Sequence, residues 1–435
     1  MKKIILVLMP VAAMLVACKP QNNDDPGNTV EDPITVSLPV PTVEVKSLSL
    51  NDTQKDYVNA GNRMGFRMLE QLYDGKDMVF SSLSLHFALA MTANGASGET
   101  LEEIVDFLGY GGGGIDALNE YSRILMEELP AVDLKSTIKV TNAMLVREDM
   151  KLLKSFQETV SSNYYAAVEN CPFSNPAMVA ARVNDWAKRN TDGFIDKVLE
   201  AGDIDPDTVA LIMNALYFKA KWAGSDYDPM FQEEFTTDEK FTCSDGSKVS
   251  VKMMHTMDYF KYAEKDGYTV VALPFRNGKY YMYFLLPTKN DIKGLIAKLP
   301  GISWKELTGS FKQDAEVYVD LPRFEVENLY QLEDAMKALG VKKAFVSGGA
   351  EFDSMFDAPG WDFWISKVIQ KAKIAVTEWG TEAGAVTVVV MDGESAAPGP
   401  EPKKVYFKAD HPFVFAIGEA SSGTLLFEGI FSGKS

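Results

Sequence analysis

Residue types that could support catalysis are few in this chain of 435 residues. Ser136 and Lys139 have the S-x-x-K spacing, in which a lysine can activate a serine nucleophile. The S-D-N and K-T-G motifs that accompany this pair in the enzymes that use it are missing, and residues 137–146 have the composition of a β-strand. No His or Cys stands at metal-ligand spacing from any of the three histidines, His86, His255 and His411. The sequence therefore indicates no catalytic centre, metal site or cofactor, and we expect a protein that is not an enzyme.

Residues 378–402, EWGTEAGAVTVVVMDGESAAPGPEP, combine features of a strand and of a loop. The segment 387–390, TVVV, has strong strand propensity, but glycine precedes it and Pro, Gly and acidic residues follow it. Exposed segments of this kind tend to aggregate, so proteins normally pair them in a sheet or guard them with charge. The sequence thus predicts a strand former inside a long loop.

Composition indicates a folded domain with a soluble partner. Apolar residues make up 46% of the chain and aromatic residues 11%, which is enough for a large core, and the formal net charge is −18. This charge argues against a nucleic-acid or anionic-lipid surface, because both require clustered Lys and Arg. No repeat or second linker interrupts residues 51 to about 378, so we expect one continuous domain, 51–435, acting as a monomer.

The N-terminus, MKKIILVLMPVAAMLVACKP, resembles a bacterial lipoprotein signal. Two lysines precede an apolar run that is too short to span a membrane, and the run ends in the segment 15–18, LVAC. The resemblance implies a signal peptide over 1–17, a lipid on Cys18 and a location in the bacterial cell envelope, at the outer membrane and exposed on the surface. An ordinary secretory signal with an incidental cysteine is the alternative. Residues 18–50 are polar and Pro-rich and read as a flexible tether.

The two other cysteines, Cys171 and Cys243, do not form a disulfide framework, and we expect buried free thiols.

Hydrophobic periodicity predicts helices first and many strands later, which is the α+β pattern. Helices are expected at 52–73, 84–93, 100–108 and 329–339. Strands are expected at 209–222, 248–254, 269–274, 280–286 and 316–321, and residues 404–432 read as two strands around a turn.

Several segments, taken in order over residues 51–432, resemble the serpin family. They are FSSLSL (80–85) followed by ALAMTANGASGETLEEIVDFLG (88–109), NDWA (184–187) with NTDGFI (190–195), NALYFK (214–219) with Trp222, LPRF (321–324) and ADHPF (409–413). In addition, EWGTEAGAVT (378–387) is similar to the hinge of inhibitory members. The resemblance implies the α+β serpin fold, in which a helical layer packs on a large central mixed β-sheet, accompanied by further sheets and an exposed C-terminal reactive loop, here about 378–402.

The resemblance also implies a serine-type endopeptidase inhibitor that acts as a suicide substrate. A protease cleaves the loop and forms an acyl-enzyme, and insertion of the hinge into the central sheet traps it. Independently, Thr381, Ala383, Ala385 and Thr387 are all small and share one face at period two, as a strand entering a preformed sheet requires. The expected hinge consists of Glu378, Gly380, Thr381, Glu382, Ala383, Gly384, Ala385, Val386 and Thr387.

Family spacing, counted from Glu378, places the reactive bond between Glu394 and Ser395. A glutamate there implies an acid-preferring serine protease as the target. The alternatives, cleavage after Val390 or Met391, suit an elastase-like enzyme, and cysteine proteases are a further class of target.

Six residues match family positions that control opening of the sheet: Ser81, Ser84, Asn214, Gln370, Trp222 and Arg323. Gln370 stands where the family usually has a histidine, and Trp379 where it usually has a charged residue. The alternative interpretation is that Trp222 is only a core residue and Ser81 only a helix cap. The alternative function is a non-inhibitory serpin that acts as a binding or carrier module. Such members usually have bulky, charged or Pro-containing hinges, whereas residues 380–385 here are GTEAGA. An envelope enzyme, the third class, has no supporting residues.

Overall fold

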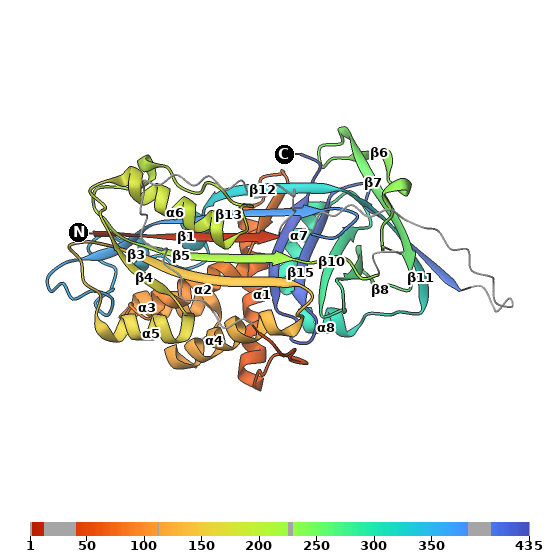
Figure 1. Cartoon of the computed structure of the whole chain (residues 1–435). Helices are drawn as coiled ribbons and strands as arrows, with labels where there is room; N and C mark the ends of the chain where they lie inside the picture. Colours follow the sequence, from red (N-terminus) through yellow and green to blue (C-terminus); the bar gives the residue numbers. More distant parts are fainter. Residues whose placement is uncertain (1, 13–40, 111–112, 225–228, 382–401, 435) are drawn as a thin grey trace.

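The computed structural model describes residues 2–12, 41–110, 113–224, 229–381 and 402–434. Its three sheets and the helices around them form the elongated body shown in Figure 1. The largest sheet has six strands, in the order β12 (Phe324–Gln331), β13 (Phe363–Val376), β1 (Lys2–Ala12), β5 (Thr208–Lys219), β3 (Thr137–Arg147) and β4 (Ala167–Cys171). We call it the central sheet.

The two other sheets lie at the opposite end of the molecule from the N-terminus (Figure 1). One has the order β2 (Met78–Phe80), β16 (Leu425–Phe431), β15 (Phe413–Glu419), β10 (Tyr280–Pro287), β9 (Tyr268–Pro274) and β8 (Lys261–Lys265). The other has the order β14 (Lys403–Lys408), β11 (Ala315–Pro322), β7 (Lys248–Asp258) and β6 (Thr237–Thr242). We call the latter the distal sheet.

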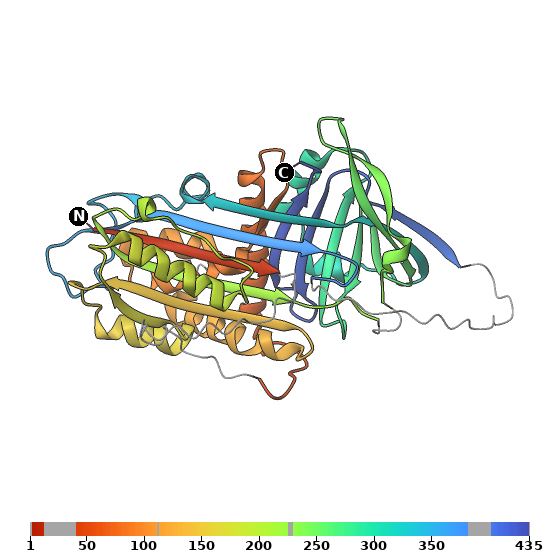
Figure 2. The ribbon, with the colours of Figure 1, turned by 45° about the horizontal axis from the view of Figure 1, so that its top comes forward.

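Helices cover both faces of the central sheet (Figure 2). The described α-helices are α1 (Asp52–Leu72), α2 (Ser82–Ala93), α3 (Gly98–Leu108), α4 (Gly114–Val132), α5 (Lys154–Tyr164), α6 (Pro176–Asn190), α7 (Ile292–Lys298), α8 (Trp304–Gly309) and α9 (Glu333–Ala338). Every residue of α2 is buried, since this helix lies between the sheet and the other helices, and it accordingly has no polar face. Helix α6 covers the opposite face of the sheet, where its Trp186 is 2% exposed.

Strand β1 lies in the middle of the central sheet, between β13 and β5, and runs parallel to both (Figure 2). Ile4, Leu6 and Leu8 face the helical layer around α2, and Ile5 and Val7 face the side of α6. All five side chains are fully buried, and burial of each contributes roughly 1.5–3 kcal/mol. A strand buried on both faces needs such a continuous apolar run, and residues 4–8 provide it.

The α+β prediction is confirmed, and the predicted helices 52–73, 84–93 and 100–108 match α1, α2 and α3. Two other predictions are wrong. Residues 329–331 belong to the end of β12 and not to a helix, because Tyr330 pairs with Gln370 across the ladder to β13; the helix there is only α9. Residues 404–432 form three strands instead of two, because ADHP breaks the first segment and sends β14 and β15 into different sheets.

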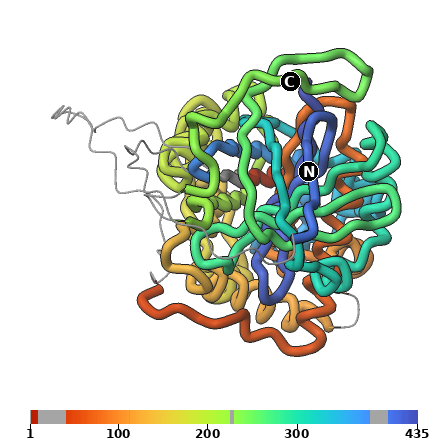
Figure 3. Tube along the Cα trace, turned by 90° about the vertical axis from the view of Figure 1, so that its right-hand side faces the viewer, coloured from red at the N-terminus to blue at the C-terminus, as the bar shows by residue number. Residues whose placement is uncertain are grey.

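Packing of the domain begins before residue 51. The Val45 N–H donates to the Ala131 carbonyl at 2.9 Å, and Leu48 is 7% exposed. Figure 3 shows this stretch, in red-orange, on the outer side of the helices. Among the described helices none is both long and apolar enough to cross a membrane.

Candidate functional site

A tight turn links the end of β13 to the predicted hinge. The Thr377 N–H donates to the Gly380 carbonyl at 3.0 Å, and the Gly380 N–H donates to the Thr377 carbonyl at 3.1 Å. Gly380 has φ +105°, and a Cβ at this position would lie 2.4 Å from the Ala220 carbonyl oxygen. Only glycine fits this backbone without strain, so the turn directs the chain back toward the end of β5.

Thr381 already pairs with the chain that continues from β5. Its N–H donates to the Ala220 carbonyl at 2.9 Å, and its hydroxyl accepts from the Ala220 N–H at 3.0 Å. The residue is fully buried. Thr381 of the expected hinge is therefore bound at the mouth of the space between β5 and β13, which is the position that strand entry from this end would start from.

Glu378 and Arg323 form an ion pair at the same end of the sheet. Arg323 Nη2 lies 2.5 Å from Glu378 Oε1, and the Thr236 hydroxyl donates to the same oxygen at 2.6 Å. Glu378 is 1% exposed. Burial alone would raise the pKa of Glu378, but the hydrogen bonds from Arg323 and Thr236 outweigh it and lower the pKa below its usual value. The carboxylate therefore stays charged and ties the hinge to the start of β12.

Trp222 packs beneath this turn. Its ring stacks on Phe275 with centroids 4.6 Å apart, and its Nε1 donates to the Thr377 carbonyl at 2.8 Å. Trp379 stands at the rim, where its Nε1 donates to Glu233 Oε1 at 3.0 Å. Trp222 is therefore both a core residue and a direct partner of the turn.

The four polar residues predicted to lie under the sheet do come together. Ser81 and Gln370 exchange two hydrogen bonds, from the Ser81 N–H to Oε1 at 3.0 Å and from Nε2 to the Ser81 carbonyl at 3.1 Å. The Ser84 hydroxyl donates to Asn214 Oδ1 at 2.5 Å. All four are fully buried, and Ser81 is also the N-cap of α2. This cluster joins α2 to β5 and β13, so it resists their separation as long as its hydrogen bonds hold.

Residues 59–433 match the model of the family described as "Serpin (serine protease inhibitor)". The chain belongs to the serpin family. Its relatives include Iripin-2 of Ixodes ricinus, which is 32% identical over 382 residues, with 85% of this chain and 91% of that protein covered. Serpin B11 of Homo sapiens is 31% identical over 384 residues, covering 84% and 95% of the two chains.

Solved serpin structures agree with this assignment. The native state of the thermophilic serpin Tengpin superposes with a TM-score of 0.79 at 27% identity, covering 90% of this chain and 97% of the other. The fold expected from the sequence, a helical layer with a large central sheet and further sheets, is thus confirmed.

Several predicted site residues of this serpin lie outside the described residues. They are the lipidation site Cys18, the hinge residues Glu382, Ala383, Gly384, Ala385, Val386 and Thr387, and the candidate reactive-bond residues Val390, Met391, Glu394 and Ser395. Their roles stay predictions. Cys171 and Cys243 are buried and unpaired, as expected.

Two residues of the site have no sequence signal that could have found them. Asn142 lies opposite Asn214 in the β3–β5 ladder, and Asn214 Nδ2 donates to its Oδ1 at 2.8 Å. Thr236, the second partner of Glu378, follows a 3-10 turn, η2 (Glu233–Phe235), far from the hinge in sequence. The Asn142 contact depends on strand register and the Thr236 contact on tertiary packing, and a single sequence reveals neither.

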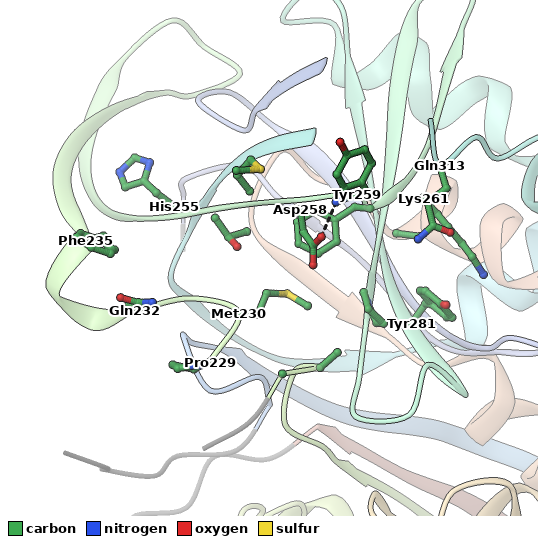
Figure 4. A pocket seen from close by; sticks show the side chains of 17 residues that line it. Pro229, Met230, Gln232, Phe235, His255, Asp258, Tyr259, Lys261, Tyr281 and Gln313 are labelled. Atoms are coloured by element: carbon green, nitrogen blue, oxygen red, sulfur yellow. Dashed lines mark hydrogen bonds between the residues drawn. The ribbon is translucent and has the colours of Figure 1, made fainter. Parts of the chain in front are cut away.

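A surface pocket of about 430 Å³ lies between the distal sheet and the edge of the neighbouring sheet. Figure 4 shows His255 and Phe235 at one end, with Lys261 and Gln313 at the other. Within the described ranges, no group of three or more His, Cys, Asp or Glu side chains is arranged to hold a metal ion.

His255, at the rim of this pocket, lies between a hydroxyl and a carboxylate. Its Nε2 is 2.9 Å from the Thr237 hydroxyl, and its Nδ1 is 2.7 Å from Asp320 Oδ1. This resembles a nucleophile–base–acid order, but Glu239 Oε1 also approaches Nε2 at 3.5 Å, and the other carboxylate oxygen of Glu239, Oε2, pairs with Lys408 Nζ at 2.9 Å. The group is therefore better described as a ladder of charges across neighbouring strands than as a catalytic triad.

Proposed function

We propose that this serpin inhibits serine endopeptidases as a suicide substrate, by inserting its cleaved reactive loop into the central sheet. The observation that carries the proposal is the geometry of the hinge. Thr381 is fully buried and already hydrogen-bonded to Ala220, at the mouth of the space between β5 and β13. The turn at Gly380 brings Thr381 to the chain that continues from β5, and the residues that come next in the sequence are small at alternate positions.

The chemistry is an interrupted acyl transfer. The serine Oγ of the protease attacks the carbonyl carbon of Glu394, the bond to the Ser395 nitrogen breaks, and the new amine leaves with a proton. An ester between the protease serine and Glu394 remains. Insertion of the hinge then adds backbone hydrogen bonds worth roughly 0.5–1.5 kcal/mol each, and a dozen of them supply on the order of 10 kcal/mol. That free energy drives distortion of the bound protease before water can hydrolyse the ester.

The proposal is tested by substituting Thr381 with arginine. An arginine at this fully buried position would place an unpaired guanidinium where the inserting strand begins, which is strongly unfavourable, so we expect Thr381→Arg to be cleaved as a substrate without trapping protease. Thr381→Ser keeps a small hydroxyl side chain and is the matched control. The measurement uses a protein of residues 18–435, which lacks β1, and is the yield of complex stable in SDS after mixing with glutamate-specific and elastase-like proteases, with mass spectrometry locating the cut. Equal trapping by the arginine variant and the control would refute insertion through this hinge.

A non-inhibitory binding or carrier role is the second candidate, and one observation favours it. In the full-length chain β1 fills the space between β5 and β13, so a loop strand has no free place in the sheet. The inhibitory and the non-inhibitory function differ in one respect that can be tested, which is whether the reactive loop inserts into the sheet once β1 has left it.

We further propose that a mature protein beginning at Cys18 is lipid-anchored in a bacterial envelope, at the outer membrane and facing outward. The LVAC segment supports the lipid anchor at Cys18. Glu394 supports a glutamate-preferring target, while Val390 and Met391 support an elastase-like one. A monomer suffices for this mechanism, because hinge and sheet belong to one chain.

A further inference from the structure

The N-terminal segment 2–12 occupies the same space in the central sheet that the reactive loop would enter. On one side its pairs run from Lys2 with Phe363 to Ala12 with Ile374. On the other side they run from Lys3 with Thr208 to Ala12 with Phe218. The strand is therefore hydrogen-bonded on both edges along nearly the whole length of β5.

Charge fixes the beginning of this strand. Lys3 Nζ lies 3.0 Å from Asp205 Oδ2, and Lys2 Nζ lies 3.8 Å from Asp207 Oδ1. Lys2 Nζ also stands 4.8 Å from the centroid of the Trp361 ring. The two lysines that precede the apolar run thus have acidic partners at the end of the sheet, in addition to the full burial of residues 4–8.

The far end of the strand blocks the entry of the hinge. Thr381 is bound to Ala220, and two residues earlier on that chain Phe218 lies opposite Ala12. Farther along, Leu8 lies opposite Asn214 on one side and Gln370 on the other. Any strand that continued from Thr381 along β5 would need the backbone positions that residues 12 to 2 now fill.

We propose that residues 2–12 act as an intramolecular plug of the central sheet, so that the full-length chain is a protease substrate and removal of its N-terminal segment makes it an inhibitor. This inference rests on the insertion mechanism proposed above. It assigns the N-terminal segment a second role. The apolar run of residues 2–12 keeps the central sheet closed, and loss of the segment opens the space for the reactive loop.

The test uses the full-length chain with a single substitution in the plug. Leu6→Asp places a carboxylate at a fully buried position and expels the strand, whereas Leu6→Met conserves volume and leaves it in place. Hydrogen exchange should show amides 2–12 protected in the wild type and in Leu6→Met, and exchanging at least roughly 100-fold faster in Leu6→Asp.

The consequence is measured by thermal melts before and after a single cut between residues 390 and 397. We expect the midpoint to stay unchanged in the wild type and in Leu6→Met, and to rise by roughly 20 °C in cleaved Leu6→Asp, where the loop can insert. If Leu6→Asp does not fold, the double variant Lys2→Glu with Lys3→Glu repels Asp205 and Asp207 at the strand's start. Arginine at both positions is its control.

The outcomes separate the plug from the insertion mechanism. Equal gains in midpoint for cleaved wild type and Leu6→Asp, or unprotected amides 2–12 in the wild type, would overturn the plug alone. If Leu6→Asp loses protection and neither cleaved protein gains stability, the insertion mechanism fails and the role of the plug fails with it.

Discussion

At the scale of single residues, one of the fully buried carboxyl groups of this serpin takes its hydrogen bonds from a serine and not from a cation. Glu428 of β16 is fully buried and accepts from the Ser82 N–H at 3.2 Å and the Ser82 hydroxyl at 2.6 Å, at the first turn of α2. A Cβ at Gly65 of α1 would lie 2.6 Å from Oε1, so a glycine there leaves room for the carboxyl group. Burial raises the pKa of Glu428 to about 7, against the opposing hydrogen bonds from Ser82.

We expect Glu428→Gln to remove a pH dependence of stability. Because the folded pKa of Glu428 lies above the unfolded value, its contribution is fully present below about pH 4.5 and is lost as pH rises through about 7. Between pH 8 and pH 5 the free energy of unfolding of the wild type should rise by roughly 2–3 kcal/mol relative to the variant. Urea unfolding at both pH values measures this. The control is Glu306→Gln, on the exposed surface of α8, whose free energy of unfolding should change with pH as that of the wild type does. The same change with pH in Glu428→Gln as in the wild type would contradict the expectation.

Sequence predicted part of the buried polar cluster at this scale. The family motifs located Ser81, Ser84 and Asn214, and the position of Gln370 could be counted within its strand. Asn142 and Glu428 were not predicted, because their hydrogen-bond partners lie on other elements. A buried polar side chain in an apolar strand is recognisable in sequence, whereas its hydrogen-bond partner depends on register.

At the scale of elements, the hinge is attached to β12 by the Arg323–Glu378 pair and to β5 by Thr381. Arg323 directly precedes β12, and Glu378 follows the end of β13, so the pair joins the ends of two neighbouring strands. The apolar strands of this region were predictable from their continuous hydrophobic run, as at 209–222. The last residues of β12 were not, because the sequence from Leu329 also fits helical spacing and only the ladder to β13 decides the outcome.

Arg323→Ala should destabilise the protein and loosen the hinge. The substitution leaves Glu378, which is 1% exposed, without its cation. A fully buried pair would cost 3–5 kcal/mol, but the Arg323 side chain is 41% exposed, so we expect about 2 kcal/mol in urea unfolding. Amides 377–381 should also exchange faster. Arg323→Lys keeps the charge and should lower the free energy of unfolding by less than Arg323→Ala does. Equal free energies of unfolding for the alanine variant and the wild type would show that the ion pair contributes nothing.

At the scale of the whole molecule, the N-terminus has two different interpretations, one from the sequence and one from the structure. The sequence predicts a signal peptide over 1–17, and the structure describes residues 2–12 as β1. The same composition serves both, because an apolar run with two leading lysines suits a signal and also a strand buried on both faces with acidic partners at its start. Periodicity alone does not distinguish these fates.

Attachment through Cys18 is the prediction that belongs here. Cys18→Ser should release the protein from membranes or leave its signal uncleaved, because the thioether to the lipid cannot form. Detergent phase partitioning and incorporation of labelled lipid measure this in cells. Cys171→Ala, which leaves residue 18 intact, should stay in the detergent phase. Unchanged partitioning of Cys18→Ser would count against lipidation.

The pairing of β1 with β13 also has a consequence for timing. Lys2 pairs with Phe363 at the start of β13, so one of the two strands that flank β1 does not exist until more than three quarters of the chain has been made. At roughly 5–20 residues per second, synthesis up to that point takes on the order of 20–70 s. If the N-terminus is the signal proposed above, this interval is the time in which export machinery could bind it before β1 forms. On that proposal, a chain bound early would not form β1, and the closed sheet would belong to chains that finish synthesis with residues 2–12 free.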